Sequence, residues 1–181
     1  HFQLALLLTT CLVLGQFSVI PYISPTMVAN VGFKEEDLAW IYLLGGGVTI
    51  VTGPLVGKLA DRLGKFKIFV IAVIMSMGVT WLLTHMGHIP HWQALLVTTS
   101  FFICANGRMI PLTAMLLAVV PPQRRGGFMG LNNAMQQIAS GCATLLAGMI
   151  IIKSAEGQLL HYAWIGYFSI LMSSITILVA G

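Results

Sequence analysis

Long apolar runs, separated by short polar connections, dominate this 181-residue sequence. Six of these runs are long enough to cross the hydrocarbon core of a bilayer as helices, which takes about 20 residues each. The runs cover residues 4–27, 38–57, 67–84, 92–120, 128–152 and 160–181. Away from their ends, only Arg108 carries a charge. The pattern therefore predicts an all-α integral membrane domain of six transmembrane helices that extends over residues 1–181.

The overall composition excludes several classes of protein. Hydrophobic residues make up 57% of the chain and charged residues 8%, whereas about 25% of the residues in a soluble domain are charged. A disordered chain and a nucleic-acid-binding domain are therefore excluded. The net charge of +4 comes from basic residues in short loops, which is typical of a multi-pass membrane protein. The bilayer, and not a nucleic acid, is the expected partner of this surface.

Lys and Arg are distributed unevenly over the connecting loops. The loops after the second and fourth runs contain Lys58, Arg62, Lys65, Lys67, Arg124 and Arg125. The other three loops contain only Lys34 and Lys153. Basic loops stay on the cytoplasmic side of a membrane. This bias predicts a protein of the cell (plasma or inner) membrane with both termini in the cytoplasm.

A faint internal repeat divides the chain into two halves of three helices. The pair Ile20-Pro21 near the end of the first run recurs 90 residues later as Ile110-Pro111. Because each repeat would contain an odd number of helices, the two copies would have opposite orientations in the membrane. We therefore expect a 3+3 inverted repeat.

The connection after the second run carries the most specific motif of the chain. It reads GPLVGKLADRLGKFK over residues 53–67 and resembles the cytoplasmic G-x-x-x-D-R-x-G-[RK]-[RK] signature of the major facilitator superfamily. The resemblance implies a latch between transporter halves, formed by Gly57, Asp61, Arg62, Gly64, Lys65 and Lys67. Phe66 replaces the second basic residue of the signature, and this departure is similar to the looser copy found in the second half of such proteins.

A second resemblance extends over nearly the whole chain. Residues 107–111 (GRMIP), residues 121–129 (PPQRRGGFM) and the group Gln136, Gln137, Ser140 and Gly141 resemble the tenth and eleventh helices of the sugar- and drug-efflux branch of this superfamily. The resemblance implies that the chain is the C-terminal half of a twelve-helix transporter. It also implies export of a small organic solute, such as a sugar or a drug, by alternating access. Proton coupling would then depend on the N-terminal six-helix half.

Two alternatives to this interpretation remain open at the level of the sequence. The chain could be a complete six-helix carrier that builds the twelve-helix transporter with a second copy. It could also be a membrane receptor or scaffold that does not transport. The sequence contains no H-E-x-x-H, G-x-S-x-G or P-loop motif, so an enzyme is not predicted, and no cofactor is expected.

Arg108 is the strongest candidate for a functional residue. A charged side chain in the middle of a membrane helix costs about 2.5 to 3.5 kcal/mol on insertion scales, so it faces protein or a water-filled cavity. We predict that Arg108 faces the central cavity and holds an electronegative group of the substrate or a carboxylate of the other half. A structural arginine that joins two helices is the competing interpretation. No Asp or Glu lies inside the six runs, so a proton-carrying carboxylate would come from the other half.

Polar side chains in three of the runs predict one wall of the substrate cavity. In the fifth run, residues 133, 136 or 137, 140 and 144 recur at helical spacing, so one helix face is polar. Such a face either lines a cavity or joins helices by hydrogen bonds. The residues assigned to the cavity are Gln16, Asn106, Arg108, Asn133, Gln136, Gln137 and Ser140.

Small residues in the second run predict close helix packing. Gly45, Thr49 and Gly53 follow one another at four-residue spacing, which lets a second helix approach the backbone. The resemblance implies that this second helix belongs to the other half. His85, His88 and His91 do not predict a metal site, because Pro90 interrupts the helical spacing between them. The three cysteines are expected to be packing residues.

Overall fold

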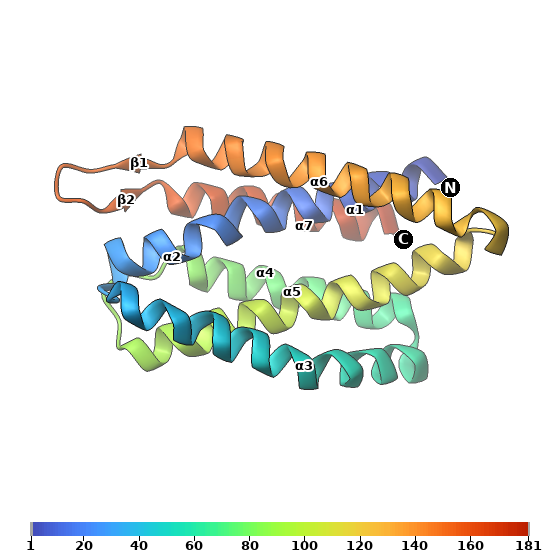
Figure 1. Ribbon diagram of the computed structural model, residues 1–181, viewed down its shortest axis with the longest axis horizontal. Coiled ribbons are helices and arrows are strands. Elements are labelled where there is room, and N and C mark those ends of the chain that lie inside the picture. Colours follow the sequence, from blue (N-terminus) through green and yellow to red (C-terminus); the bar gives the residue numbers. More distant parts are fainter. Residues whose placement is uncertain (1, 181) are drawn as a thin grey trace.

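The computed structural model of the chain describes residues 2–180, most of which lie in long helices that run side by side (Figure 1). The long helices are α1 (Phe2–Val19), α3 (Leu38–Leu63), α4 (Lys65–Thr84), α5 (His91–Val119), α6 (Arg125–Ile150) and α7 (Tyr162–Ala180). The shorter elements are the 3₁₀ helices Ile20–Tyr22, Glu35–Asp37 and Pro122–Arg124, the one-turn helix α2 (Ile23–Thr26), the π-helix Met27–Val31, and strands β1 (Ile152–Lys153) and β2 (Leu159–Leu160).

The six long helices form two halves, α1, α3 and α4 followed by α5, α6 and α7, and the first helix of each half packs against the last two helices of the other half. Helix α1 packs against α6 and α7, whereas α5 packs against α3 and α4. Helices α4 and α7 also contact each other, so the same contacts recur when α1, α3 and α4 are exchanged with α5, α6 and α7. Helices α1 and α5 run in opposite directions in Figure 1. This arrangement confirms the all-α fold with two inverted groups of three helices.

Several helix boundaries differ from those expected. The first span continues through short helical turns as far as Val31, and α3 extends to Leu63 instead of ending at residue 57. Hydropathy alone misplaces such ends because a helix continues beyond the hydrocarbon while its backbone groups stay paired. Ile152 was expected to end one helix and Leu160 to begin the next, but both residues belong to the β1–β2 hairpin instead. The end of the last predicted run, at residue 181, lies outside the described residues.

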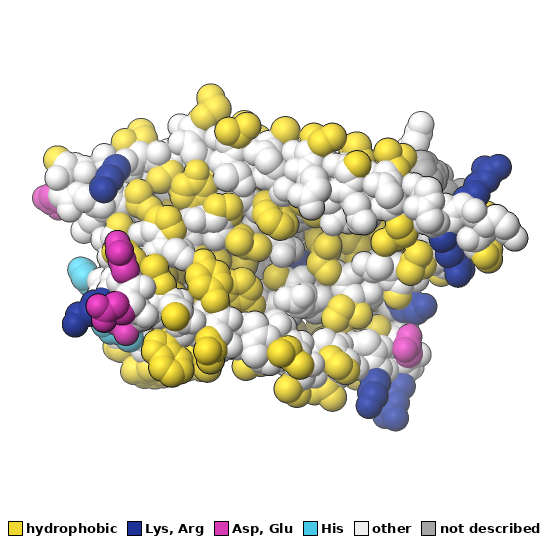
Figure 2. All heavy atoms as spheres, in the orientation of Figure 1, with side chains coloured by type: hydrophobic (Ala, Val, Ile, Leu, Met, Phe, Trp, Pro, Cys, Tyr) yellow, Lys and Arg dark blue, Asp and Glu magenta, His cyan; other side chains and the backbone are white. Residues whose placement is uncertain are grey.

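Helix α6 differs from its neighbours in polarity. Within residues 2–180, five helical segments are long and apolar enough to cross a membrane, and α6 is not among them. Helix α6 has 26 residues, ample for a span, but it carries several amide and hydroxyl side chains. The large side chains exposed on its outer side are nevertheless apolar, as they are on α3 and α7 (Figure 2). This combination is typical of a helix that faces lipid on one side only.

The first span is irregular where its two prolines interrupt the helix. Pro21 has no N–H to donate to the carbonyl oxygen of Phe17, and the chain tightens into a 3₁₀ turn at Ile20–Tyr22. Neighbouring helices supply donors for the freed carbonyls: Thr144 Oγ1 donates to the oxygen of Phe17 at 3.5 Å, and Tyr162 Oη donates to the oxygen of Val19 at 3.2 Å. Membrane helices tolerate proline where such side chains are available.

Close helix contacts within the chain involve several glycines, two of which lie between α3 and α5 and between α4 and α7. A Cβ atom added at Gly45 of α3 would collide with Phe102 of α5, and one added at Gly166 of α7 would collide with Thr84 of α4. Gly53 also faces α5, near Ile110. Gly45 and Gly53 therefore have a neighbour, α5, within the same chain, and packing of this stripe against the other half stays a prediction.

The two ends of the bundle are closed in different ways. At one end, Gly64 joins α3 directly to α4 with a φ of +100°, which L side chains rarely adopt. At the other end, the side chain of Asn30 is hydrogen-bonded to both the backbone N–H and the carbonyl oxygen of Leu159, at 2.8 and 2.9 Å. This pair of bonds attaches the β1–β2 hairpin to the end of the first span.

Candidate functional site

Arg108 of α5 lies in the interior of the bundle, with 1% of its surface exposed. Its Nη1 donates to the hydroxyl oxygens of Ser76 (α4) and Ser173 (α7) at 3.1 and 3.3 Å. Its Nη2 donates to Oε1 of Gln16 (α1) at 3.3 Å. The Nε–H group has no hydrogen-bond partner within residues 2–180. One guanidinium therefore connects four helices near the middle of the bundle.

This position corrects the expectation that Arg108 itself faces the central cavity. The guanidinium turns inward because three oxygen acceptors are available there, and a buried charge without acceptors would be far more costly. The side chain that reaches from this cluster toward the surface is that of Gln16, which is half-buried. The cluster therefore lies behind Gln16.

The orientation of the Gln16 amide follows from its partner. Arginine has only donor groups, so the oxygen of the amide must face the guanidinium. The NH₂ group of Gln16 is then turned away from Arg108, and within the described chain it has no hydrogen-bond partner. Gln16 thus presents two unused donors near the middle of the first span, Gln3–Val31.

Helix α6 has three distinct sides. Phe128, Ala139, Ala143 and Ala147 are buried, as is Asn132, whose Oδ1 accepts a hydrogen bond from Thr9 Oγ1 at 2.8 Å. One flank exposes the large apolar side chains of Leu131, Ile138, Leu145 and Met149. The opposite flank carries Asn133, Gln137, Ser140 and Thr144, of which Asn133 and Gln137 are exposed and Ser140 and Thr144 are half-buried. Gln136 lies between this polar flank and the buried side and is half-buried.

The polar flank of α6 borders the same open face as α1 and α5. Thr144 contacts the backbone of Phe17, a half-buried residue of α1. Asn106 of α5 is exposed, and its amide donates to the carbonyl oxygen of Phe102 at 3.0 Å. Helices α1, α3, α5 and α6 lie nearest the viewer in Figure 1, with α4 and α7 behind them. The same view in Figure 2 shows a hollow between two sets of neighbouring helices, α1, α6 and α7 on one side and α3, α4 and α5 on the other. We call this side of the bundle the open face.

The residues of the predicted latch lie at the end of the bundle where α3 meets α4. Asp61 and Arg62 belong to the last turns of α3 and not to a loop, because the helix continues to Leu63. Both side chains are exposed, as is that of Lys67, and Lys65 is half-buried. A Cβ atom added at Gly57 would meet no other atom within 4 Å. The part of the chain that the structure describes therefore supplies no packed partner for this motif.

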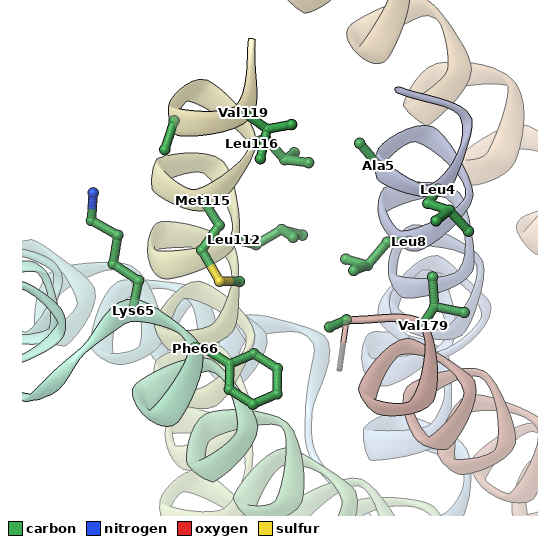
Figure 3. A pocket seen from close by; sticks show the side chains of 12 residues that line it. Leu4, Ala5, Leu8, Lys65, Phe66, Leu112, Met115, Leu116, Val119 and Val179 are labelled. Carbon is green, nitrogen blue, oxygen red and sulfur yellow. The ribbon is translucent and has the colours of Figure 1, made fainter. Parts of the chain in front are cut away.

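A cavity of about 500 Å³ opens at this same end, between the first turns of α1 and α4 and the last turns of α5 and α7. Leu8 and Leu112 point into it from opposite sides, whereas the ammonium group of Lys65 points away (Figure 3). The cavity is lined mainly by apolar side chains and contains none of the four side chains of the Arg108 cluster, although Leu112 lies only one turn from Arg108 on α5, so we do not assign it to the candidate site.

Sequence reasoning missed several residues of this site. It did not identify Ser76 and Ser173 as the acceptors of Arg108, because single hydroxyl residues are common in membrane helices and these two form no spacing pattern with residue 108. It also missed the pairing of Asn132 with Thr9. The change from a buried amide at residue 132 to an exposed one at residue 133 follows only from the helix contacts.

Comparison with known proteins identifies the family of the chain. The model of the Major Facilitator Superfamily matches residues 5–181. The chain is 23% identical to the multidrug export protein EmrB of Haemophilus influenzae over 168 residues, which are 92% of this chain and 31% of that protein. It is 28% identical to the fatty acid resistance protein FarB of Neisseria gonorrhoeae over 147 residues, which are 81% of this chain and 27% of that protein.

A third relative is the uncharacterized MFS-type transporter Rv1877 of Mycobacterium tuberculosis, 30% identical over 141 residues, which are 75% of this chain and 19% of that protein. The chain spans less than a third of the length of these three relatives. The family match agrees with the motif at the α3–α4 junction and with the packing of the two halves of three helices. This multi-pass, helical cell-membrane chain belongs to the major facilitator superfamily.

Proposed function

We propose that this chain is the C-terminal six-helix half of a secondary active transporter, which exports a small lipophilic solute by alternating access. In this proposal α6 crosses the bilayer as the sixth span, and the open face lines the substrate cavity against an N-terminal half. Both termini, the α3–α4 junction and the α5–α6 loop lie in the cytoplasm. Gln16, Asn106, Asn133, Gln136, Gln137 and Ser140 line the cavity wall. Proton coupling uses a carboxylate of the other half.

The observation that carries this proposal is the amide groups on the open face. Asn106 and Gln137 are exposed near the middle of α5 and α6, at a depth where lipid offers no hydrogen-bond partner. A polar group left unpaired in hydrocarbon costs several kcal/mol. This face therefore meets water or another protein. A scaffold that packs only through apolar surfaces would not need such amides.

The exposed residues at the end of α3 support a latch at the cytoplasmic end. Asp61 and Arg62 are charged, exposed and without an ion-pair partner in the described chain, so they are available to a second six-helix unit. Most of the Lys and Arg residues gather at this end of the bundle (Figure 2), as the positive-inside rule requires of a cytoplasmic end. Asp61 is expected to control the conformational cycle and not to bind the substrate.

Two relatives favour a lipophilic solute over a sugar. EmrB is named a multidrug export protein and FarB a fatty acid resistance protein. The open face of this chain combines amides with half-buried apolar side chains such as Phe17, whereas a sugar site needs a dense set of polar groups. A lipophilic organic compound fits this surface better.

Flux in proteoliposomes tests the proposal. The full-length protein should move lipophilic compounds from a mixed panel faster than protein-free vesicles, and a pH gradient should accelerate that movement. The six-helix chain alone should give little flux, because half of the cavity wall is missing. Comparable flux by the six-helix chain would favour the homodimeric carrier, and absence of flux from a folded full-length protein would favour the receptor or scaffold.

A further inference from the structure

The bundle encloses one positive charge that residues 2–180 do not neutralise. Arg108 hydrogen-bonds only to neutral oxygens, and none of the four helices that surround it contains an Asp or Glu. Only 1% of its surface is exposed, so a carboxylate from another six-helix unit cannot contact the guanidinium directly. The charge therefore acts on its surroundings through Gln16 and through the low-dielectric interior.

Gln16 transmits this charge to the open face. Its oxygen accepts from Arg108, and its NH₂ group is turned away from the guanidinium and has no partner within the described chain, on a side chain that is only half-buried. A hydrogen bond to the oxygen polarises the amide, which makes its N–H groups stronger donors. A solute at this position meets a donor pair with a positive charge behind it.

We propose that Arg108 holds and polarises Gln16, and that this pair makes the cavity selective for lipophilic carboxylates. The inference rests on the proposed transport function and adds the substrate class. In it, Gln16 contacts the carboxylate and Arg108 is a positioning residue. A carboxylate accepts two donors and is attracted by the charge, a neutral amide receives only the hydrogen bond, and a cation is repelled.

Three fluorescent probes of the same shape test this selectivity. They are 2-naphthoate, 2-naphthamide and 2-naphthylmethylammonium, which carry a negative, a neutral and a positive head group at pH 7.4. Binding is measured with the full-length protein in zwitterionic nanodiscs, and empty nanodiscs are subtracted to remove partition into lipid. Naphthoate should bind about tenfold more tightly than naphthamide, as expected for a charge-assisted hydrogen bond, and the ammonium probe should bind most weakly.

Variants separate this role from a structural one. Gln16→Leu should abolish the preference for naphthoate over naphthamide, and Gln16→Glu, whose carboxylate would neutralise Arg108, should abolish it as well. Arg108→Gln should also remove the preference, whereas Arg108→Lys keeps the charge and should keep part of it. Ser174→Ala, next to Ser173 but bonded only to the carbonyl oxygen of Ile170, is the matched control. A merely structural defect would weaken all three probes equally and leave their ratio unchanged.

The outcomes distinguish this inference from the proposed function. Preference for naphthoate in the native protein and its loss in Gln16→Leu support the inference. Equal binding of the three probes, a preference for the cation, or a preference that survives Gln16→Leu overturns it, even if the protein transports other solutes. A folded protein that neither binds these probes nor moves any compound of the flux panel contradicts the transport function itself.

Discussion

Replacement of Arg108 by Met should leave the folded protein at least as stable as before while flux falls by about tenfold or more. Methionine has a similar length but no charge, so the variant removes a buried charge without opening a large cavity. Burial of an ion costs several kcal/mol in real proteins. The three hydrogen bonds of Arg108 recover only part of that cost, because its Nε–H group has no partner in the described chain.

The partners that Arg108 leaves behind should tolerate this change. The hydroxyl of Ser76 still donates to the carbonyl oxygen of Val73 at 2.8 Å, and Gln16, already half-exposed, can turn toward the open face. Thermal unfolding and proteoliposome flux are measured on the same purified full-length variant, with Ser174→Ala as the control. A large loss of melting temperature together with normal flux per folded molecule would show that Arg108 is only a structural residue.

Lysine substitutions at two adjacent positions of α6 should have opposite outcomes. Ile138 has 63% of its surface exposed on the apolar flank, and Gln137 is exposed on the polar flank. Both lie in the middle of α6, where a lysine that faces lipid costs about 2.5 to 3.5 kcal/mol, roughly a hundredfold in an insertion equilibrium. Ile138→Lys should therefore reduce the folded yield strongly, whereas Gln137→Lys should keep most of it.

Size-exclusion chromatography of the detergent-extracted full-length protein measures this difference. Ile138→Met, which keeps an apolar side chain, is the control for any change at that position. Equal yields of the two lysine variants would mean that both flanks of α6 meet similar surroundings. A lower yield for Gln137→Lys than for Ile138→Lys would place the polar flank against lipid and would contradict the open face.

The sequence predicts the helices better than their contacts. The hydropathy of each run alone indicates that it lies in the membrane, so spans such as 67–84 are recognisable without knowledge of their neighbours. The packing of helices from one half against helices from the other depends on contacts such as Gly45 with Phe102 and Gly166 with Thr84. The two residues of each pair are far apart in the chain. The faint Ile-Pro repeat indicates the inverted halves but not which helices touch.

The candidate site was predictable only in part. Polarity inside an apolar run singles out Arg108, Gln16 and the amides of α6, because such residues are costly in lipid. The direction of each side chain was not predictable, because it depends on acceptors that other helices supply. Arg108 turns inward to Ser76 and Ser173, whereas the exposed amides remain at the surface because no helix of this chain covers them.

Cysteine labelling along α6 tests the open face most directly. In the full-length protein with Cys142 replaced by Ala, single cysteines are placed at Asn133, Gln137 and Thr144 and at Leu131, Ile138 and Leu145, and each variant is treated with a water-soluble maleimide. The account predicts that the first three are labelled through the cavity and protected by a bound solute, while the second three, which face lipid, stay unlabelled. Equal labelling of both flanks, or labelling of the second set alone, would contradict it.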